Sequence, residues 1–530
     1  MCLHCAAVER SLMKLLPIGI QDFEKMGSGD YFYVDKTKII HELITTGSYY
    51  FIARPRRFGK SLLLSTIKCI FEGKKELFND LWIATNTDYS WQVHPVIHLS
   101  FTSIDYATPE RLEKSLIMKL KKLAQDVGIS YPEDVSLVFL FEHLVQSLAA
   151  KGKVVLLIDE YDKPIVDHIN NPELAEAMRN QLRMFYAVIK DLDPYLKFVF
   201  ITGVSKFAQT SIFSGLNNLR DLTMEKSVAT LFGCTKEELE ITFSDSLDVF
   251  ARNLHISFQE ALAKMTEWYD GYRFHLNAQH VYNLFSVMNA LASGEFHNYW
   301  MRSGTPTFLI ELFKKGNYIP QIDPDYQISA SHFEIVNFSR IAFIPLLYQT
   351  GYLTLLEKTE SGMFRLDFPN KEVSDSFTEI IAAGVFEKDQ SEIHSLAAPL
   401  GRMLENLEID DFFEQIKRFY AGIPYTVAVP DREKHYQTIF YVLTKIIGMK
   451  AFVEVATNRG SIDFVLELKK HIFIFEFKIR GTAQDALTQI KATQYDQKYR
   501  GLGKQIVLVG ALFSIQERNI DSWVYEVIGK

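Results

Sequence analysis

Residues 50–64 read Tyr-Phe-Ile-Ala-Arg-Pro-Arg-Arg-Phe-Gly-Lys-Ser-Leu-Leu-Leu. The apolar start predicts a short strand, and Gly59, Lys60 and Ser61 open an apolar segment with helical spacing. Backbone N–H groups at the beginning of a helix attract phosphate; in such a loop the lysine reaches the phosphates and the serine hydroxyl takes a Mg²⁺ position. The usual loop has glycine where this chain has Arg54, so a chance Gly-Lys-Ser at a helix start is the alternative.

The composition is that of an ordinary folded protein with more than one domain. The 530 residues are 48% apolar and 23% charged, and the length predicts two to four domains. No apolar run approaches the ~18 residues of a membrane span, and the first dozen residues lack a signal-like apolar core. Four cysteines favour a reducing compartment, so we expect a cytoplasmic protein. A net charge of −8 argues against coating nucleic acid with the whole surface.

Two further apolar segments predict buried strands with polar ends. Residues 154–158 are apolar without alternation and lead into Asp159 and Glu160, whereas residues 198–201 lead into Thr202. Such runs are typical of parallel strands that are covered on both faces. Strands that alternate with helices predict a doubly wound α/β domain, in which ligands bind at the carboxyl ends of the strands.

The order of these segments predicts a nucleotide-hydrolysing site that uses Mg²⁺. Asp159 would hold Mg²⁺ through water, and Glu160 would orient or deprotonate the attacking water. Thr202 or Ser205 would sense the γ-phosphate. The alternative is that the two carboxylates merely end a solvated strand; the upstream Gly-Lys-Ser favours nucleotide binding over that alternative.

Four stretches resemble a bacterial AAA-ATPase-like family, whose members usually carry a C-terminal PD-(D/E)XK nuclease-like domain. They are Val34-Asp35-Lys36-Thr37, Arg54-Pro55-Arg56-Arg57-Phe58-Gly59-Lys60-Ser61, Leu157-Ile158-Asp159-Glu160-Tyr161-Asp162 and Phe213-Ser214-Gly215-Leu216-Asn217-Asn218. The resemblance spans residues 16 to about 377 and implies that Arg54 is a family trait of the loop. The residues expected to bind the cofactor are Arg56, Arg57, Phe58, Gly59, Lys60, Ser61, Asp159 and Thr202, with Ser61 and Asp159 at the metal. Whether the arginines contact phosphate or are simply solvated stays open.

The middle of the chain is helical and rich in aromatic residues. We expect these aromatic side chains to form core rather than ligand platforms. A segment around residues 352–355 and another at 364–368 predict a small strand pair. The pattern suggests a helical lid with a winged-helix-like module, and it assigns no chemistry to this region.

Near the C-terminus, residues 462–468 and 471–479 predict two strands joined at Lys469-Lys470. A turn at that position pairs Asp463 with Glu476, which places both carboxylates on one face with Cβ atoms ~4.5–5.5 Å apart. A slip of one residue would move Asp463 to the opposite face. Such a slip is a real alternative because Lys-Lys is not a preferred two-residue turn.

Lys478 follows Glu476 by two residues and therefore shares its face. Two close carboxylates repel unless a cation lies between them, and oxygen ligands suit Mg²⁺ or Mn²⁺. The lysine could position or activate water near a phosphodiester. The alternative is that Glu476 and Lys478 form an ordinary ion pair on an edge strand.

Gly460-Ser461-Ile462-Asp463 and Glu476-Phe477-Lys478 resemble the PD-(D/E)XK nuclease motif, with Ile462 in place of the proline. The resemblance implies Asp463 and Glu476 as metal ligands and Asp463, Glu476 and Lys478 as catalytic residues, beside Glu160 of the ATPase. Glu433 or Glu454 would supply an upstream carboxylate. Gln489 and Tyr495 would give polar support.

We therefore expect an α/β protein of three parts: a P-loop NTPase (ASCE/AAA-like) domain over residues 14–230, a helical and winged-helix-like middle over 231–385, and a restriction-endonuclease-like α/β domain over 391–530. The expected function is ATP binding and hydrolysis coupled to a Mg²⁺-dependent DNA endonuclease. The alternative is a nucleotide-gated switch or scaffold that binds nucleic acid without cleaving it. The expected partner is nucleic acid, with DNA favoured, and no membrane; a homo-oligomer is one of the states left open.

Overall fold

The computed structural model describes residues 14–206, 212–213, 215–302, 326–330, 333, 343–386, 390–422, 433–446, 449–457 and 459–529. The chain divides into two compact units. The first, which we call the N-terminal unit, comprises Met1–Ser303 and Asp325–Val373. The second, the C-terminal unit, comprises Gly304–Pro324 and Ser374–Lys530.

The N-terminal unit is built on a five-stranded sheet in the order β2-β3-β4-β1-β5, with parallel pairing throughout its ladders. The strands are β1 (Tyr49–Ala53), β2 (Val96–Ser100), β3 (Val154–Asp159), β4 (Leu196–Gly203) and β5 (Arg220–Asp221). Every residue of β1 and β3 is buried. The predicted parallel strands with two covered faces are thus confirmed.

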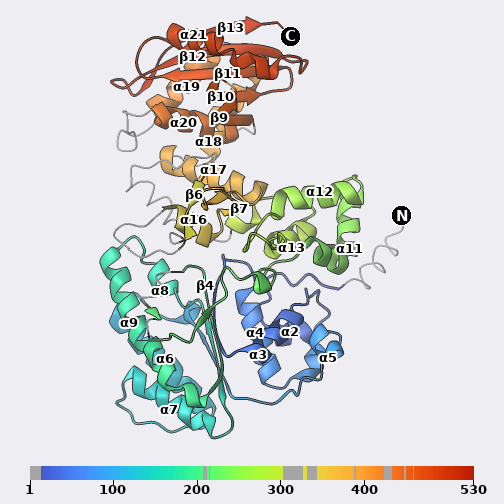
Figure 1. Ribbon diagram of the computed structural model, residues 1–530, viewed down its shortest axis with the longest axis vertical. Helices are drawn as coiled ribbons and strands as arrows, with labels where there is room; N and C mark the ends of the chain where they lie inside the picture. Colours follow the sequence, from blue (N-terminus) through green and yellow to red (C-terminus); the bar gives the residue numbers. More distant parts are fainter. Residues whose placement is uncertain are drawn as a thin grey trace. The chain divides into compact units, whose positions relative to one another are not determined.

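Helices cover both faces of this sheet, as a doubly wound fold requires (Figure 1). One side carries α2 (Phe23–Gly27), α3 (Thr37–Thr46), α4 (Lys60–Phe71) and α5 (Trp82–Asn86); the other carries α6 (Pro109–Asp126), α7 (Leu137–Ala149), α8 (Lys163–Val166) and α9 (Pro172–Asp191). Local sequence sets where they begin. Thr108 and Asn171 cap α6 and α9 through their side chains, and a proline follows each cap in the first turn.

The rest of the N-terminal unit is mainly helical. Its helices are α11 (Lys236–Asn253), α12 (Phe258–Tyr269), α13 (Leu284–Ser293), α14 (Tyr299–Arg302), α16 (Phe343–Thr350) and the start of α17 (Lys371–Phe386). A small antiparallel sheet in the order β6-β8-β7 accompanies them, formed by β6 (Tyr326–Ile328), β7 (Thr354–Lys358) and β8 (Phe364–Asp367). Strand β6 was not predicted. The aromatic residues Tyr269 and Tyr272 are buried, which confirms their assignment to the core.

The C-terminal unit holds a mixed sheet in the order β13-β12-β11-β10-β9. Its strands are β9 (Lys450–Thr457), β10 (Gly460–Glu467), β11 (His471–Lys478), β12 (Gln505–Ser514) and β13 (Asn519–Ile528), and only β11 and β12 pair in parallel among these ladders. The connection between β11 and β12 contains α21 (Ala483–Thr493). The described helices before the sheet are α18 (Gln390–Glu405), α19 (Ile409–Ala421) and α20 (Glu433–Ile446).

Two apolar layers hold the C-terminal sheet between helices. On one face, Phe440 of α20 packs against Phe464, Phe475 and Phe477 at centroid distances of 5.0–5.3 Å. On the other face, Leu487 of α21 belongs to a buried cluster with residues of β10, β11 and β12. Gly510 on β12 allows this close packing, because a Cβ there would lie 2.3 Å from the carbonyl oxygen of Ala483.

Within the part of the chain that the structure describes, no helix combines the length and apolar character that a membrane crossing needs.

Candidate functional site

The loop between β1 and α4 lies at the carboxyl end of an inner strand of the parallel sheet. Gly59 precedes α4 with φ 86° and ψ 21°, a left-handed conformation that favours glycine. The Nζ atom of Lys60 donates hydrogen bonds of 2.9 Å to the carbonyl oxygens of Arg54 and Pro55. Burial lowers the pKa of Lys60. The lysine therefore closes the loop on itself with an ammonium group inside.

Asp159 is bonded to two other residues of the predicted nucleotide site. Its two carboxylate oxygens accept hydrogen bonds from Ser61 Oγ at 2.5 Å and from Thr202 Oγ1 at 2.8 Å. Asp159 ends β3, Thr202 lies near the end of β4, and Ser61 is in the first turn of α4. Because β1, β3 and β4 are neighbours in one parallel sheet, their carboxyl ends bring these groups to one edge.

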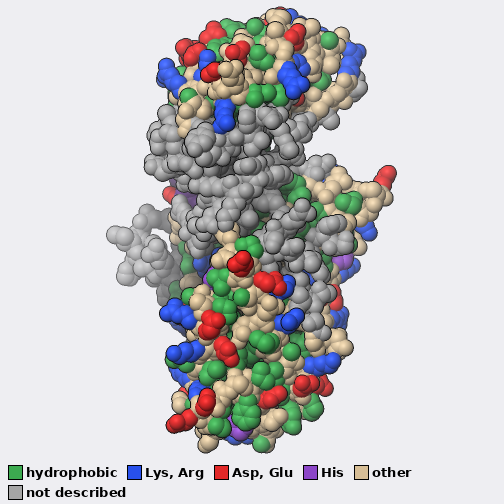
Figure 2. All heavy atoms as spheres, turned by 90° about the vertical axis from the view of Figure 1, so that its left-hand side faces the viewer, with side chains coloured by type: hydrophobic (Ala, Val, Ile, Leu, Met, Phe, Trp, Pro, Cys, Tyr) green, Lys and Arg blue, Asp and Glu red, His purple; other side chains and the backbone are tan. Residues whose placement is uncertain are grey.

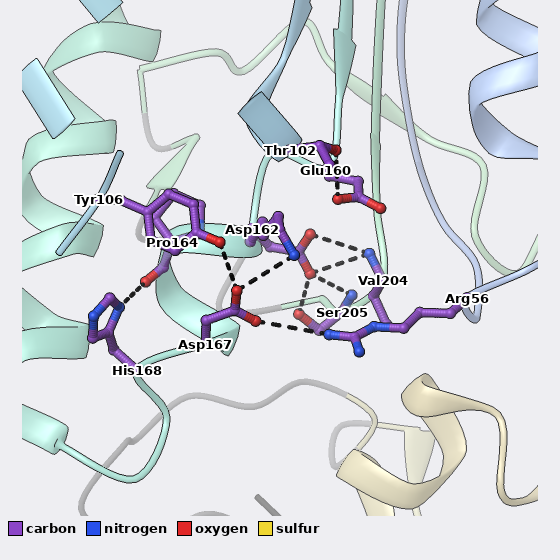
Figure 3. A network of polar contacts seen from close by, with 11 residues as sticks. Arg56, Thr102, Tyr106, Glu160, Asp162, Pro164, Asp167, His168, Val204 and Ser205 are labelled. Atoms are coloured by element: carbon purple, nitrogen blue, oxygen red, sulfur yellow. Dashed lines mark hydrogen bonds and ion pairs between the residues drawn. The ribbon is translucent and has the colours of Figure 1, made fainter. Parts of the chain in front are cut away.

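Glu160 follows directly after β3 and adopts a left-handed backbone, with φ 54°. Its Oε2 atom accepts a hydrogen bond of 3.0 Å from the hydroxyl of Thr102, in the short 3-10 helix Phe101–Ser103 after β2 (Figure 3). Sequence reasoning did not identify Thr102. Thr102 could have been found from its position just after β2, the strand beside β3, because polar side chains at the ends of neighbouring parallel strands reach the same sheet edge.

Ser205 lies near this edge but contacts a different carboxylate (Figure 3). Asp162 accepts hydrogen bonds from the backbone N–H groups of Val204 at 3.1 Å and Ser205 at 2.7 Å, and from the Ser205 hydroxyl. Asp162 is fully buried, and burial raises its pKa. This carboxylate fixes the turn after β4, and of the two predicted sensors Thr202 is the one bonded to Asp159.

Arg54 is an interior residue, not a solvated one. Its Nη1 atom donates to the carbonyl oxygens of Ala53 at 2.9 Å and Thr223 at 2.7 Å. The guanidinium carbon lies 4.0 Å from the ring centroid of Phe274, and the residue is 1% exposed. Burial lowers its pKa to about 10. Arg54 thus ties the loop to the helical part of the N-terminal unit.

The other two loop arginines are exposed and lie in different surroundings. The Nη2 atom of Arg56 is 3.7 Å from Oδ1 of Asp167. The other carboxylate oxygen of Asp167, Oδ2, accepts a hydrogen bond of 2.7 Å from the hydroxyl of Tyr106 (Figure 3). The guanidinium carbon of Arg57 is 4.8 Å from the ring centroid of Phe285. Arg56 is therefore the loop arginine whose charge lies beside the acidic residues of this edge.

The helical part of the N-terminal unit also contacts the loop directly. Phe58 packs edge-on against Tyr272 at a centroid distance of 4.7 Å. The indole N–H of Trp300 donates a hydrogen bond of 3.1 Å to the carbonyl oxygen of Arg56. Gly351 has φ 92°, and a Cβ there would lie 2.7 Å from the Cβ of Pro55. Sequence reasoning assigned Phe58 to the cofactor site and the aromatic residues of the middle region to the core. It could not connect Tyr272 and Trp300 to the loop, because no local pattern reports such distant contacts.

In the C-terminal unit, the hairpin has the predicted register. Phe464 pairs with Phe475, and the N–H of Leu468 donates to the carbonyl oxygen of His471 at 2.9 Å across the Lys469-Lys470 turn. The one-residue slip does not occur.

The paired part of the hairpin ends at Phe464 and Phe475, so Asp463 and Glu476 lie one position beyond its last pair. The Oδ2 atom of Asp463 accepts a hydrogen bond of 2.8 Å from the backbone N–H of Phe477. This bond holds Asp463 against β11, beside Glu476.

Gln489 on α21 bridges the other two predicted residues. Its side-chain N–H donates to Oε1 of Glu476, and its Oε1 atom accepts a hydrogen bond of 2.7 Å from Lys478 Nζ. Glu476 is 3% exposed. Burial raises the pKa of nearby Tyr495, as do the charges of Glu476 and Asp463. The side chains of Glu433 and Glu454 lie outside the described residues.

Family models match both the region of the parallel sheet and the region of the C-terminal hairpin. The family model described as Predicted AAA-ATPase matches residues 17–213, and the PD-(D/E)XK nuclease superfamily model matches residues 431–523. A protein of Azotobacter chroococcum mcd 1, described as an uncharacterized protein in the vnfD 5' region, is 35% identical over 533 residues, covering 97% of this chain and 99% of that protein. The chain therefore belongs to the AAA-ATPase-like family and carries a C-terminal domain of the PD-(D/E)XK nuclease superfamily.

Proposed function

We propose that the N-terminal unit binds and hydrolyses Mg·ATP, and that the C-terminal unit is a metal-dependent DNA endonuclease regulated by that hydrolysis. The observation that carries the first part is the convergence of Lys60, Ser61, Asp159 and Thr202 at one edge of a parallel sheet. The second part rests on the hairpin register, which brings Asp463 and Glu476 to one end of the hairpin, and on Gln489, which bonds to both Glu476 and Lys478.

The donor set at the sheet edge fits a magnesium nucleotide. A serine hydroxyl and a carboxylate are hard oxygen ligands, which Mg²⁺ prefers, and the ion would neutralise charge on the phosphate oxygens. Lys60 would exchange its two carbonyl partners for phosphate oxygens, because an ammonium group bonds more strongly to an anion. Glu160 would leave Thr102 to accept a proton from the attacking water.

The hairpin site fits a divalent metal on the same chemical grounds. Asp463 and Glu476 would be the ligands, and the metal would polarise the phosphodiester and lower the pKa of a bound water. Gln489 would fix the orientation of both Glu476 and Lys478, since it bonds to each. Lys478 would then hold the water or the leaving oxygen in place.

Nucleic acid would bind at this site rather than over the whole surface. Among the described residues on the face drawn in Figure 2, basic and acidic side chains are interspersed, without one large field of either sign. Two arginines flank the catalytic end of the hairpin: Arg459 precedes β10 and Arg480 follows β11. Both are exposed, and neither forms an ion pair with any residue that the structure describes. Their charges are available for phosphates on either side of the cleaved bond.

The nuclease is tested by incubating the full-length chain with plasmid and linear DNA in Mg²⁺, Mn²⁺ or EDTA, with and without ATP. Metal-dependent cleavage that is lost in Asp463→Ala would support the endonuclease. Tight DNA binding without cleavage in either metal would favour the binding-only switch or scaffold instead.

The nucleotide site is tested by calorimetry of ATP binding to the wild type and Lys60→Ala. We expect binding to be abolished by the substitution. An unchanged affinity would show that this loop is not the nucleotide site.

A further inference from the structure

The peptide group between Arg56 and Arg57 is oriented from outside the loop. Trp300 of α14 donates its indole N–H to the Arg56 carbonyl oxygen at 3.1 Å. The described peptide bonds are all trans, and in a trans peptide group the C=O and the N–H point in opposite directions. The N–H of Arg57 belongs to the same group as the Arg56 carbonyl and therefore points away from Trp300.

Arg57 needs such outside support because its backbone is strained. Its φ is 68°, in the left-handed region that residues other than glycine rarely adopt. A strained conformation persists where the surrounding structure holds it. Trp300 holds the carbonyl before Arg57, Phe285 stacks on its guanidinium, and Gly351 packs against Pro55. The loop lacks the flexible glycine that usually stands at position 54, so its neighbours set its shape.

Trp300 is itself fixed by a buried carboxylate. Glu372, in the first turn of α17, accepts hydrogen bonds through one oxygen from the Trp300 backbone N–H at 2.8 Å and from the Ser286 hydroxyl at 3.0 Å. Glu372 is 0% exposed. The Trp300 ring packs edge-on against Tyr352 at a centroid distance of 5.1 Å. Residues from α13, α14 and α17 thus meet at one carboxylate behind the loop.

We propose that Trp300 is a positioning residue for the nucleotide: by holding the Arg56 carbonyl outward, it aims the Arg57 N–H at the bound phosphates, and Glu372 keeps Trp300 in place. This inference rests on the proposed binding of ATP at the loop. Neither residue contacts the nucleotide in this account. The helical part of the N-terminal unit supplies the loop geometry that glycine would otherwise permit.

Trp268 offers a matched control for Trp300. It is a partly buried tryptophan of the same unit, its ring stacks on Phe296 at 5.9 Å, and Lys371 lies over it at 5.0 Å. Those contacts are within the helical part and not with the loop. Replacing it by phenylalanine therefore reproduces the loss of an indole while leaving the Arg56 carbonyl bonded.

The test measures ATP affinity by calorimetry and steady-state hydrolysis for the full-length wild type, Trp300→Phe, Trp268→Phe and two Glu372 variants, with thermal melting to verify folding. Trp300→Phe should weaken ATP binding roughly three- to tenfold, the factor expected for one lost hydrogen bond, and should raise KM more than it lowers kcat. Trp268→Phe should match the wild type. Glu372→Gln keeps the accepting oxygen and should retain affinity, whereas Glu372→Leu should behave like Trp300→Phe.

A folded Trp300→Phe protein that binds ATP as tightly as the wild type would overturn the inference and leave the proposed ATP site intact. If the wild type itself does not bind ATP, the proposed function is what fails. Should Trp300→Phe not fold, Ser286→Ala takes its place, because it removes one of the groups bonded to Glu372. Weaker ATP binding in Ser286→Ala would then support the inference, and unchanged binding would overturn it.

Discussion

The two candidate sites hold their carboxylates by different means. Asp159 is bonded by Ser61 and Thr202, which are 98 and 43 residues away in the chain, and the loop beside it is bonded by Trp300, 244 residues from Arg56. In the C-terminal unit, Asp463 and Glu476 are bonded by groups only 14 and 13 residues away. The candidate nucleotide site therefore depends on segments from the whole N-terminal unit, whereas the candidate hairpin site is local. Distant substitutions should disturb the first and spare the second.

The largest expected effect is at the hairpin. Glu476→Gln should reduce metal-dependent DNA cleavage roughly 100-fold or more, because an amide oxygen is a poor replacement for a carboxylate ligand of a divalent metal. Glu467→Gln is the control, since Glu467 lies at the other end of β10 and forms ion pairs with Lys450 and Lys504. Equal loss in both variants, measured by plasmid nicking, would contradict a local site.

Lys60→Ala tests the candidate nucleotide site of the N-terminal unit. Removing an ammonium group that bonds to phosphate should abolish ATP binding, because the loss of a charge-assisted hydrogen bond by itself weakens affinity roughly 10- to 150-fold. Lys197→Ala removes an exposed lysine of β4 and should leave the affinity unchanged. DNA binding should be equal in both variants. A Lys60→Ala protein with wild-type ATP affinity would remove the loop from the account.

Gln489→Ala sharpens the account of the hairpin. Loss of the amide that bonds to both Glu476 and Lys478 should lower cleavage by roughly 10- to 100-fold, the range for groups that orient metal ligands. Gln484→Ala, on an exposed position of the same helix, is the matched control. Plasmid-cleavage rates at saturating metal provide the readout; equal rates for the wild type and Gln489→Ala would argue against this role.

The smallest expected effect concerns the carboxylate behind the loop. Burial raises the pKa of Glu372 to about 7 from its usual 4.5. The native state therefore binds this proton more tightly than the unfolded state, and stability falls as pH rises from about 4.5 to about 7. Glu372→Gln cannot lose that proton. Between pH 5 and 8 the free energy of unfolding of Glu372→Gln should rise by about 1–3 kcal/mol relative to that of the wild type. Thermal melting of both proteins across this pH range measures the difference. Parallel curves for the two proteins would show that Glu372 does not titrate in this range.

The difference between local and long-range contacts also explains which features could be predicted from the sequence. The strand ends at Asp159 and Thr202 followed from apolar runs, and the pairing of Phe464 with Phe475 followed from the position of a turn, because both depend on short-range periodicity. The family resemblance supplied the fold of both regions.

The interior place of Arg54 and the bond from Trp300 were not predictable in this way. Both depend on segments separated by well over 100 residues, and no local pattern encodes such contacts. Thr102 was missed for a related reason: its role depends on which strand neighbours β3.

The most direct test of two separate sites uses one preparation of the full-length Asp463→Ala protein. DNA cleavage in Mn²⁺ and ATP affinity would both be measured beside the wild type. We expect metal-dependent cleavage to be lost while ATP affinity stays at the wild-type value. Cleavage at the wild-type rate would show that the hairpin of the C-terminal unit does not carry a nuclease site.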